Sequence, residues 1–228
     1  MTPNKTNPAR HGFTLIELLV VISIIGILAG FGIVVYGSVT KNRKVATARG
    51  ELEIIKAALD LYHAKYNAYP PGNPGLALTN QLYYELSGVT LNSSTATFTT
   101  LDGSASITRP NYLSIFGSGG ILNSTKGGGE DAAAAKNFLA GLSSKMFGTY
   151  TSGGIGVTNL VTSVGGPDFT YLSGLSAHGF SGNPFRYVYP GVKNPNGYDL
   201  WVQVVTKPGT TNLVCNWSSA NQVNTLDP

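Results

Sequence analysis

A single carboxylate, that of Glu17, stands near the start of the chain inside a block of apolar residues. The block begins at Phe13, and from Leu18 to Thr40 no side chain carries a charge. A carboxylate in such a setting costs roughly 3 kcal/mol or more, so it normally has a partner and a function. The residues upstream, Met1 to His11, are polar, and one small residue, Gly12, separates them from the block. The pattern indicates a functional site around Gly12, Phe13 and Glu17.

The apolar block is long enough to cross a membrane. About 20 helical residues span the hydrocarbon core of a bilayer, and Leu, Ile and Val dominate the first half of the uncharged run. We therefore predict a leader over residues 1–12 and a transmembrane helix over residues 13–40. Gly26 and Gly30 form a Gly-x-x-x-Gly pair in this helix, a pattern that lets helices approach closely in lipid.

The junction itself resembles that of a known family. Gly12-Phe13-Thr14-Leu15-Ile16-Glu17-Leu18 is similar to the processing site of type IV prepilins and type II secretion pseudopilins. The resemblance implies that a prepilin peptidase cleaves between Gly12 and Phe13 and that the new N-terminal Phe13 is methylated. It also implies that Glu17 helps subunits enter a helical filament.

The same resemblance implies a location and a set of partners. The leader is expected in the cytoplasm, the helix in the bacterial inner membrane as a single pass, and the C-terminal domain in the periplasm. The implied partners are the prepilin peptidase, other copies of the chain, minor pseudopilins, the inner-membrane assembly platform and the lipid bilayer. Orientation rests on the resemblance, since cations stand on both sides of the run, Lys5 and Arg10 before it and Lys41, Arg43 and Lys44 after it.

Two other interpretations of the N-terminus stay open. A secretory signal peptide also has a basic start and an apolar core, but its core is normally about 7–15 residues long. An Ala-x-Ala pattern that could serve as its cleavage site, Ala46-Thr47-Ala48, lies beyond the run. A plain single-pass anchor would explain the run, but not Glu17 or the Gly12-Phe13 junction.

The charge of the chain is too small to indicate nucleic acid by itself. The formal net charge is +4 over 228 residues, of which only 11% are charged, whereas nucleic-acid binding shows as a strong basic patch. Lys41, Arg43, Lys44 and Arg49 could contact DNA, but we expect the cations after the run to lie at lipid head groups. Low charge and 29 glycines suit an extracytoplasmic domain with long loops.

No set of residues typical of an enzyme is present, so we predict a chain that is not an enzyme. The three histidines, His11, His63 and His178, lack the spacing of metal ligands. Gly117-Ser118-Gly119-Gly120 lacks the lysine of a phosphate-binding loop, and no Gly-x-Ser-x-Gly nucleophile site occurs. Cys215 is the only cysteine, which excludes an internal disulfide, and we expect it to be a small buried strand residue.

Hydrophobic spacing predicts the elements that must carry the N-terminal site. Apolar residues at alternating spacings of three and four predict an amphipathic helix over 41–67 that packs on its own domain, and Asn67 with Pro70-Pro71-Gly72 should end it. Most charged residues of this helix are expected off the apolar stripe. The stripe consists of Val45, Ala48, Leu52, Ile55, Leu59, Tyr62 and Tyr66.

Beyond the helix the sequence predicts a loop-rich insertion over 88–166 and a β-sheet over 180–228. Short helices are expected at 76–86 and 130–146, and strands at 185–189, 198–205 and 213–217. The fold class is therefore α+β, a long N-terminal helix packed on a small antiparallel sheet, as in pilins. The segment from Gly182 to Leu200 resembles the C-terminal sheet of major pseudopilins. That family often binds calcium just after this sheet, but Thr206-Lys207-Pro208-Gly209 supplies no carboxylate there, so we expect no cofactor and no metal.

Two hypotheses of different class follow. The first is a structural subunit of a type II secretion pseudopilus, or of a related type IV pilus-like filament, which supports protein export. The second is a membrane-anchored periplasmic binding module that does not polymerise. Glu17 discriminates between them, because an anchor that stays monomeric has no use for a carboxylate in its apolar segment.

Overall fold

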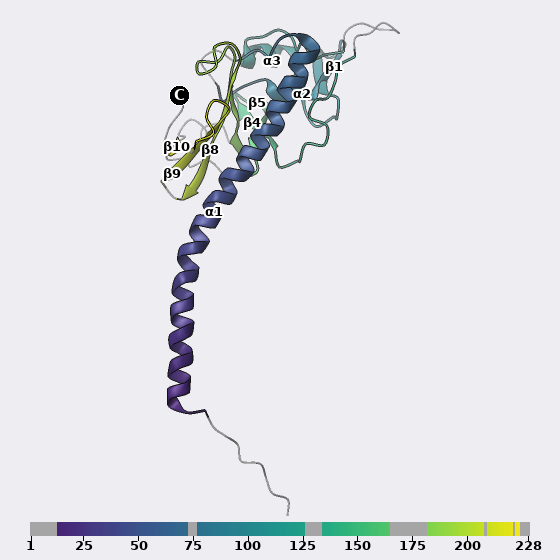
Figure 1. The fold of residues 1–228 in the computed structure, drawn as a ribbon. Coiled ribbons are helices and arrows are strands. Elements are labelled where there is room, and N and C mark those ends of the chain that lie inside the picture. The colour runs from purple at the N-terminus through teal and green to yellow at the C-terminus, as the bar shows by residue number, and fades with distance from the viewer. Residues whose placement is uncertain are drawn as a thin grey trace, which may run out of the picture. The chain divides into compact units, whose positions relative to one another are not determined.

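The structure is a computed structural model that describes residues 13–72, 77–125, 134–164, 182–207, 209–220 and 222–223, the side chains of 31–38 and of Ser152 excepted. The chain forms two compact units, residues 1–42 and 43–228. The first helix, α1 (Leu15–Tyr66), runs from the first unit into the second. The two predicted segments, 13–40 and 41–67, thus lie in one helix (Figure 1).

The helix α1 ends where the sequence predicts. Asn67 has a left-handed backbone with φ of 51°, a conformation that asparagine tolerates better than most residues and that commonly ends helices. Its N–H donates to the carbonyl of His63 at 2.8 Å. Pro70 and Pro71 then prevent the helix from resuming.

Among the described residues, no helix is both long enough and apolar enough to qualify as a membrane span. The transmembrane helix predicted over residues 13–40 therefore stays a prediction.

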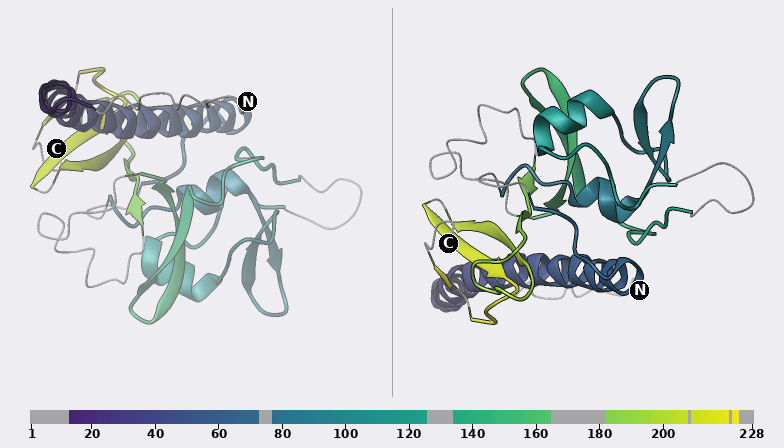
Figure 2. Two further views of the ribbon diagram at one scale, coloured as in Figure 1. Left: turned by 90° about the horizontal axis from the view of Figure 1, so that it is seen from below. Right: turned by 90° about the horizontal axis from the view of Figure 1, so that it is seen from above.

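The second unit combines α1 with three antiparallel sheets in the described part of the chain. Their strand orders are β1-β2-β3, β4-β5-β6 and β10-β9-β8-β7. Figure 2 shows the sheet of β7–β10 beside α1, and the tip of the β4–β5 hairpin pointing away from α1. The elements after α1 are α2 (Leu82–Ser87), β1 (Val89–Asn92), β2 (Thr97–Thr100), β3 (Ser106–Thr108), α3 (Arg109–Phe116), β4 (Phe147–Ser152), β5 (Ile155–Thr162), β6 (Asn183–Pro184), β7 (Arg186–Val188), β8 (Asp199–Lys207), β9 (Thr210–Cys215) and β10 (Gln222–Val223).

The predicted apolar stripe of α1 is the side that packs on the domain. Five of its side chains are fully buried, those of Ala48, Leu52, Ile55, Leu59 and Tyr62. Val45 is also buried, and Tyr66 is partly buried against the same core. This core also takes side chains from α2, α3 and all three sheets. The prediction that the stripe packs on its own domain is confirmed.

The C-terminal sheet is confirmed with altered bounds. β7 pairs antiparallel with β8, and the loop from Pro190 to Gly197 joins them. β8 pairs antiparallel with β9, which begins three residues before the predicted third strand. Cys215 is buried in β9, and burial raises the pKa of its thiol, as suits an unreactive packing residue.

Both short helices predicted in the middle of the chain are wrong in extent. The described part of 76–86 is helical only from Leu82, because backbone carbonyls before it bind elsewhere: that of Ala77 accepts from the Tyr187 N–H at 3.1 Å and that of Leu78 from the Asn159 amide at 2.6 Å. Residues 134–146 form no helix. The Phe138 N–H donates instead to the Leu86 carbonyl at 2.8 Å. Residues 126–133, including the expected helix start at Glu130, lie outside the described residues.

The region predicted as a loop-rich insertion contains regular structure. The described part of 88–166 holds β1 to β5 and α3. Thr108 caps α3 by accepting from the Asn111 N–H at 3.4 Å, and Gly117 ends α3 in the left-handed conformation. The short strands escaped prediction because Thr and Ser fill them, so they show little alternation of apolar and polar residues.

The packing of α1 makes a testable prediction at two leucines of the same helix. Leu59 is 0% exposed and Leu61 is 53% exposed. Leu59→Ala should lower the free energy of unfolding of the second unit by about 2–5 kcal/mol, because it leaves a cavity. Leu61→Ala should change it by less than about 0.5 kcal/mol. Urea unfolding of the full chain in detergent, followed by tryptophan fluorescence, measures both, and equal effects would contradict this packing.

Candidate functional site

Thr14 and Glu17 form a reciprocal hydrogen-bonded cap at the start of α1. The Glu17 carboxylate accepts from the Thr14 N–H at 2.8 Å and from the Thr14 hydroxyl at 2.8 Å. The Thr14 hydroxyl oxygen in turn accepts from the Glu17 N–H at 3.3 Å. This is the capping box, which satisfies N–H groups that the first turn of a helix leaves without partners. The sequence signal, Thr-x-x-Glu before an apolar run, was present and was missed.

The cap gives Glu17 a partner that the sequence analysis did not foresee. In the full sequence Phe13 follows Gly12 through a peptide bond, so its nitrogen is an N–H and not an ammonium. Glu17 therefore binds Thr14, one residue after the position from which an amine is expected. Because the carboxylate is exposed, a cation that approaches this end of the helix can reach it.

The helix that follows the cap presents apolar side chains on every side. Exposed fractions among them run from 49% for Val20 to 84% for Phe13. A shallow hollow is lined by Phe13, Ile16, Glu17, Val20 and Val21, which places the carboxylate at the edge of an apolar surface. So much exposed apolar surface on one helix marks a site of contact with another protein or with lipid.

The other predicted site residues besides Phe13 and Glu17 are three glycines. Gly12 lies outside the described residues. At Gly26 and Gly30, an added Cβ would meet no atom within 4 Å, so within this single chain nothing described approaches them. Their expected role in helix packing stays a prediction.

In the second unit, a buried carboxylate fixes α1 to β5. Glu51, only 7% exposed, accepts hydrogen bonds from the Thr162 hydroxyl at 2.5 Å, from the Ser163 N–H at 3.2 Å and from the Ser163 hydroxyl. The sequence analysis placed the charged residues of this helix mostly off its buried stripe, and for Glu51 that expectation is wrong. The donors compensate for its burial.

A second buried carboxylate joins α1 to the chain after α3. Glu85 of α2 accepts from the Tyr62 hydroxyl and from the N–H groups of Leu122 and Asn123, each at 3.0 Å. Burial, and then the nearby Glu85 charge, raise the pKa of Tyr62 well above the usual range. Tyr62 therefore stays protonated and donates its hydrogen bond to Glu85 throughout the neutral range.

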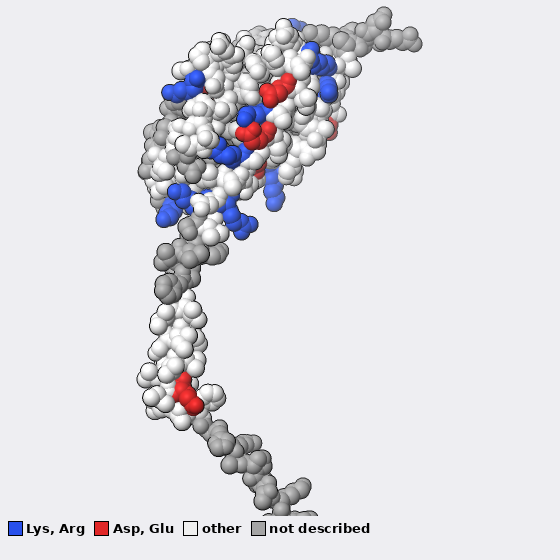
Figure 3. All heavy atoms as spheres, in the orientation of Figure 1, with Lys and Arg blue, Asp and Glu red and all other residues white. Residues whose placement is uncertain are grey.

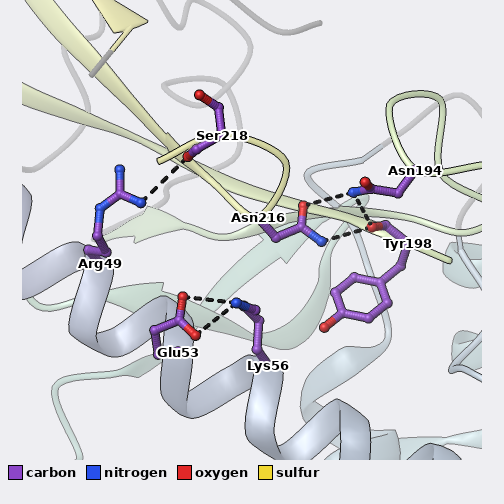
Figure 4. A network of polar contacts seen from close by, with 7 residues as sticks. All are labelled: Arg49, Glu53, Lys56, Asn194, Tyr198, Asn216 and Ser218. Atoms are coloured by element: carbon purple, nitrogen blue, oxygen red, sulfur yellow. Dashed lines mark hydrogen bonds and ion pairs between the residues drawn. The ribbon is translucent and has the colours of Figure 1, made fainter. Parts of the chain in front are cut away.

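The loop between β7 and β8 folds around a third carboxylate. Asp199 accepts from the N–H groups of Val192 and Lys193 at 2.7 Å and of Asn194 at 3.0 Å. Asn194 and Asn216 both donate to the Tyr198 carbonyl, at 3.1 and 2.9 Å, as Figure 4 shows. Protein donors hold this loop in the arrangement described, so its shape follows from the chain alone.

Two cations beside the apolar run bind carbonyls of the second unit. Lys44 donates to the Val205 carbonyl at 3.3 Å. Arg49 donates to the Ser218 carbonyl at 3.5 Å, as Figure 4 shows. On the face drawn in Figure 3, Lys and Arg gather at one end of the second unit, and further Lys, Arg, Asp and Glu lie across the rest of that face. The contacts of Lys44 and Arg49 give these cations a structural role, while lipid contact stays a prediction.

Comparison with known protein families finds a match at the N-terminus. Residues 7–33 match the family model described as the prokaryotic N-terminal methylation motif. The match contains Gly12, Phe13, Glu17, Gly26 and Gly30, that is, all the site residues that the sequence predicts.

Curated relatives match about a third of the chain. Type II secretion system core protein G of Pseudomonas aeruginosa is 45% identical over 67 residues, 29% of this chain and 47% of that protein. A type IV major pilin protein of Neisseria gonorrhoeae is 38% identical over 68 residues, 30% of this chain and 32% of the pilin. A fimbrial protein of Neisseria meningitidis is 35% identical over 78 residues, 33% of this chain and 46% of that protein.

The chain thus spans less than half the length of these relatives. No solved structure matches the chain, so the pilin-like fold predicted for the second unit is not confirmed by a structural neighbour.

The Glu51 contacts make a prediction with a matched control. Glu51→Gln keeps the shape of the side chain but replaces one acceptor oxygen by an amide, which faces the donors of Thr162 and Ser163. We expect the free energy of unfolding to fall by about 1–3 kcal/mol. Glu53→Gln removes the exposed Glu53–Lys56 ion pair and should cost less than about 1 kcal/mol. Urea unfolding of both variants tests this, and a harmless Glu51→Gln would show that the buried contacts contribute nothing.

Proposed function

The N-terminal segment of this chain belongs to the pilin and pseudopilin family, and on that premise we propose that the chain is a structural subunit of a pilus-like filament. Within this class we assign it to the type II secretion pseudopilus, as a subunit that supports protein export. The assignment to secretion follows from the match to core protein G and from the resemblance of the segment from Gly182 to Leu200 to the pseudopilin sheet.

One observation carries the proposal: the methylation motif coincides with an exposed carboxylate at the head of an apolar helix. Cleavage between Gly12 and Phe13 would create an ammonium on Phe13. Glu17 lies four residues further on, on the same helix face. The cap on Thr14 holds its carboxylate at the end of the helix, within reach of that ammonium or of the ammonium of a neighbouring copy.

The pairing explains how subunits find their register. A charge left alone in an apolar setting is heavily penalised, whereas a charge pair offsets that cost. A neighbouring copy that supplies its Phe13 ammonium to Glu17 is therefore favoured over one displaced along the helix. The exposed Leu, Ile and Val side chains of α1 then pack against their counterparts, and Gly26 and Gly30 permit close approach.

The location and partners follow from the same proposal. The apolar segment of α1 would sit in the bacterial inner membrane with the leader in the cytoplasm and the second unit in the periplasm. The prepilin peptidase would process the chain, and the assembly platform, minor pseudopilins and further copies would bind it. Neither an enzymatic activity nor a nucleic-acid partner is part of the proposal.

A second candidate, a membrane-anchored module that does not polymerise, is favoured by the second unit. Residues 43–228 form a compact unit with a core of their own, which could function on a simple anchor. That candidate leaves Glu17 with the capping role alone.

The two candidates predict different behaviour of two variants. Glu17→Gln removes the charge and keeps the shape, whereas Thr14→Val removes the capping hydroxyl and keeps the charge. If Glu17 pairs with a neighbour's ammonium, Glu17→Gln should assemble at least about tenfold less, since losing a buried pair costs about 1.4 kcal/mol or more. Thr14→Val should assemble nearly as wild type. Both variants should still be cleaved, because Gly12 is intact.

The measurement is the yield of sheared or cross-linked multimers at equal expression, in a host that carries the peptidase and the assembly platform. Equal assembly of Glu17→Gln and wild type would contradict charge pairing. Equal loss in both variants would mean that Glu17 acts only as a helix cap.

A further inference from the structure

The strand β4 presents a free edge. It pairs with β5 on one side only, in the order β4-β5-β6, with Thr149 opposite Thr158 and Tyr150 opposite Val157. In an antiparallel ladder, residues alternate between those that bond to the partner strand and those that face away. The Thr158 N–H donates to the Tyr84 hydroxyl at 3.2 Å and so does not bond to β4. Thr149 and Thr158 therefore form a non-hydrogen-bonded pair, in which the N–H and C=O groups of each residue point away from the other strand.

This alternation fixes which groups of β4 are open. Phe147 and Thr151 lie two residues from Thr149 on either side, so the N–H and C=O groups of all three residues point away from β5. Among the described residues none is bonded to these groups, and Thr149 and Thr151 are exposed. In Figure 2 the tip of the hairpin points away from α1, whereas its base lies against α1, where Thr162 of β5 donates to Glu51.

In each of the other two sheets, one edge strand bonds to another part of the chain. At β1, the Val89 N–H donates to the Asn123 carbonyl and the Val89 carbonyl accepts from the Thr125 N–H, both at 3.0 Å. At β7, the Tyr187 N–H donates to the Ala77 carbonyl at 3.1 Å. Natural edge strands also carry charges, prolines or bulges that block pairing, and β4, Phe-Gly-Thr-Tyr-Thr-Ser, has neither a charge nor a proline.

We propose that the β4 edge is a pairing surface for the β4 edge of a second copy of this chain, joined antiparallel about a two-fold axis at Thr149. This inference does not rest on the proposed function, because it uses only the second unit. A two-fold axis brings the same surface of both copies together, and two identical strands related by an axis across the edge run antiparallel.

The register follows from the open groups. With Thr149 opposite its counterpart, Phe147 faces Thr151 of the other copy, and every outward donor meets an outward acceptor. About six hydrogen bonds then join the two strands. Threonines also meet across the axis, and cross-strand threonine pairs are favourable. Any other register leaves some of the outward groups unpaired.

The size of the surface predicts weak association. Two six-residue strands bury less than the roughly 1,200 Å² that a stable specific interface needs. The pair should therefore form at high local concentration, as between copies held close together, and a covalent trap is the appropriate readout.

The test uses cysteine pairs in the full chain in detergent micelles under a mild oxidant. In the proposed register the two Thr149 Cα atoms lie about 5.5 Å apart, within the roughly 4.4–6.8 Å that a disulfide spans. The two Thr151 Cα atoms lie four residues apart along the strand, about 14 Å. Thr149→Cys should thus form disulfide-linked dimers at least tenfold faster than Thr151→Cys. The unmodified chain, with its buried Cys215, gives the background rate.

A second variant separates edge pairing from chance collision. Thr151→Pro, added to Thr149→Cys, removes one outward N–H without touching a bond to β5, so cross-linking should slow several-fold. Equal rates for Thr149→Cys and Thr151→Cys, or no effect of Thr151→Pro, would overturn the proposal. Protection of the β4 amides from hydrogen exchange without any cross-link would mean that another occupant fills the edge, and would overturn it as well.

Discussion

The exposed apolar surface at the start of α1 is the constraint on which the rest of the account depends. Side chains such as Leu15 at 82%, Ile16 at 70% and Leu28 at 64% exposure each forfeit about 1.5–3 kcal/mol in water. Among the described side chains of the first unit no packing relieves this, because all of residues 13–30 are exposed. The surface therefore demands an environment outside the chain, lipid or other helices. In the proposed filament, the charge on Glu17 aligns such helices.

The second half of α1 has its apolar side buried against the domain, and polar contacts as well as packing fix it there. Glu51 and Glu85 are buried carboxylates, and each accepts from groups that are distant in sequence: Thr162 and Ser163 for Glu51, and Leu122 and Asn123 for Glu85. A buried carboxylate is stable only where its donors are in place. These contacts thus specify one position of the helix on its domain, whereas an apolar stripe alone could slide by a turn.

The sequence was sufficient where a periodic pattern or a fixed motif was present. The buried stripe of α1, its end at Asn67 and the strands of β7 to β9 follow from spacing, from proline and from β-branched residues, and the methylation motif was recognised from seven residues. The sequence did not predict the features that depend on residues distant along the chain. In the sequence Glu51 resembles any surface acid, and only the structure shows Thr162 and Ser163 beside it. Residues 134–146 have helical composition, but the Phe138 N–H donates to the Leu86 carbonyl. The cap formed by Thr14 and Glu17 is local and was readable, but a functional explanation of Glu17 drew attention away from it.

The central claim is that Gly12 and Phe13 form the junction at which a mature, assembly-competent N-terminus is created. The most direct test is the intact mass of the full chain purified from membranes of a host that carries a prepilin peptidase. The account predicts a species that begins at Phe13, extends to Pro228 and carries one added methyl group on its terminal amine. A chain that retains Met1–Gly12, or one that is cut elsewhere, for example after Ala48, would contradict it.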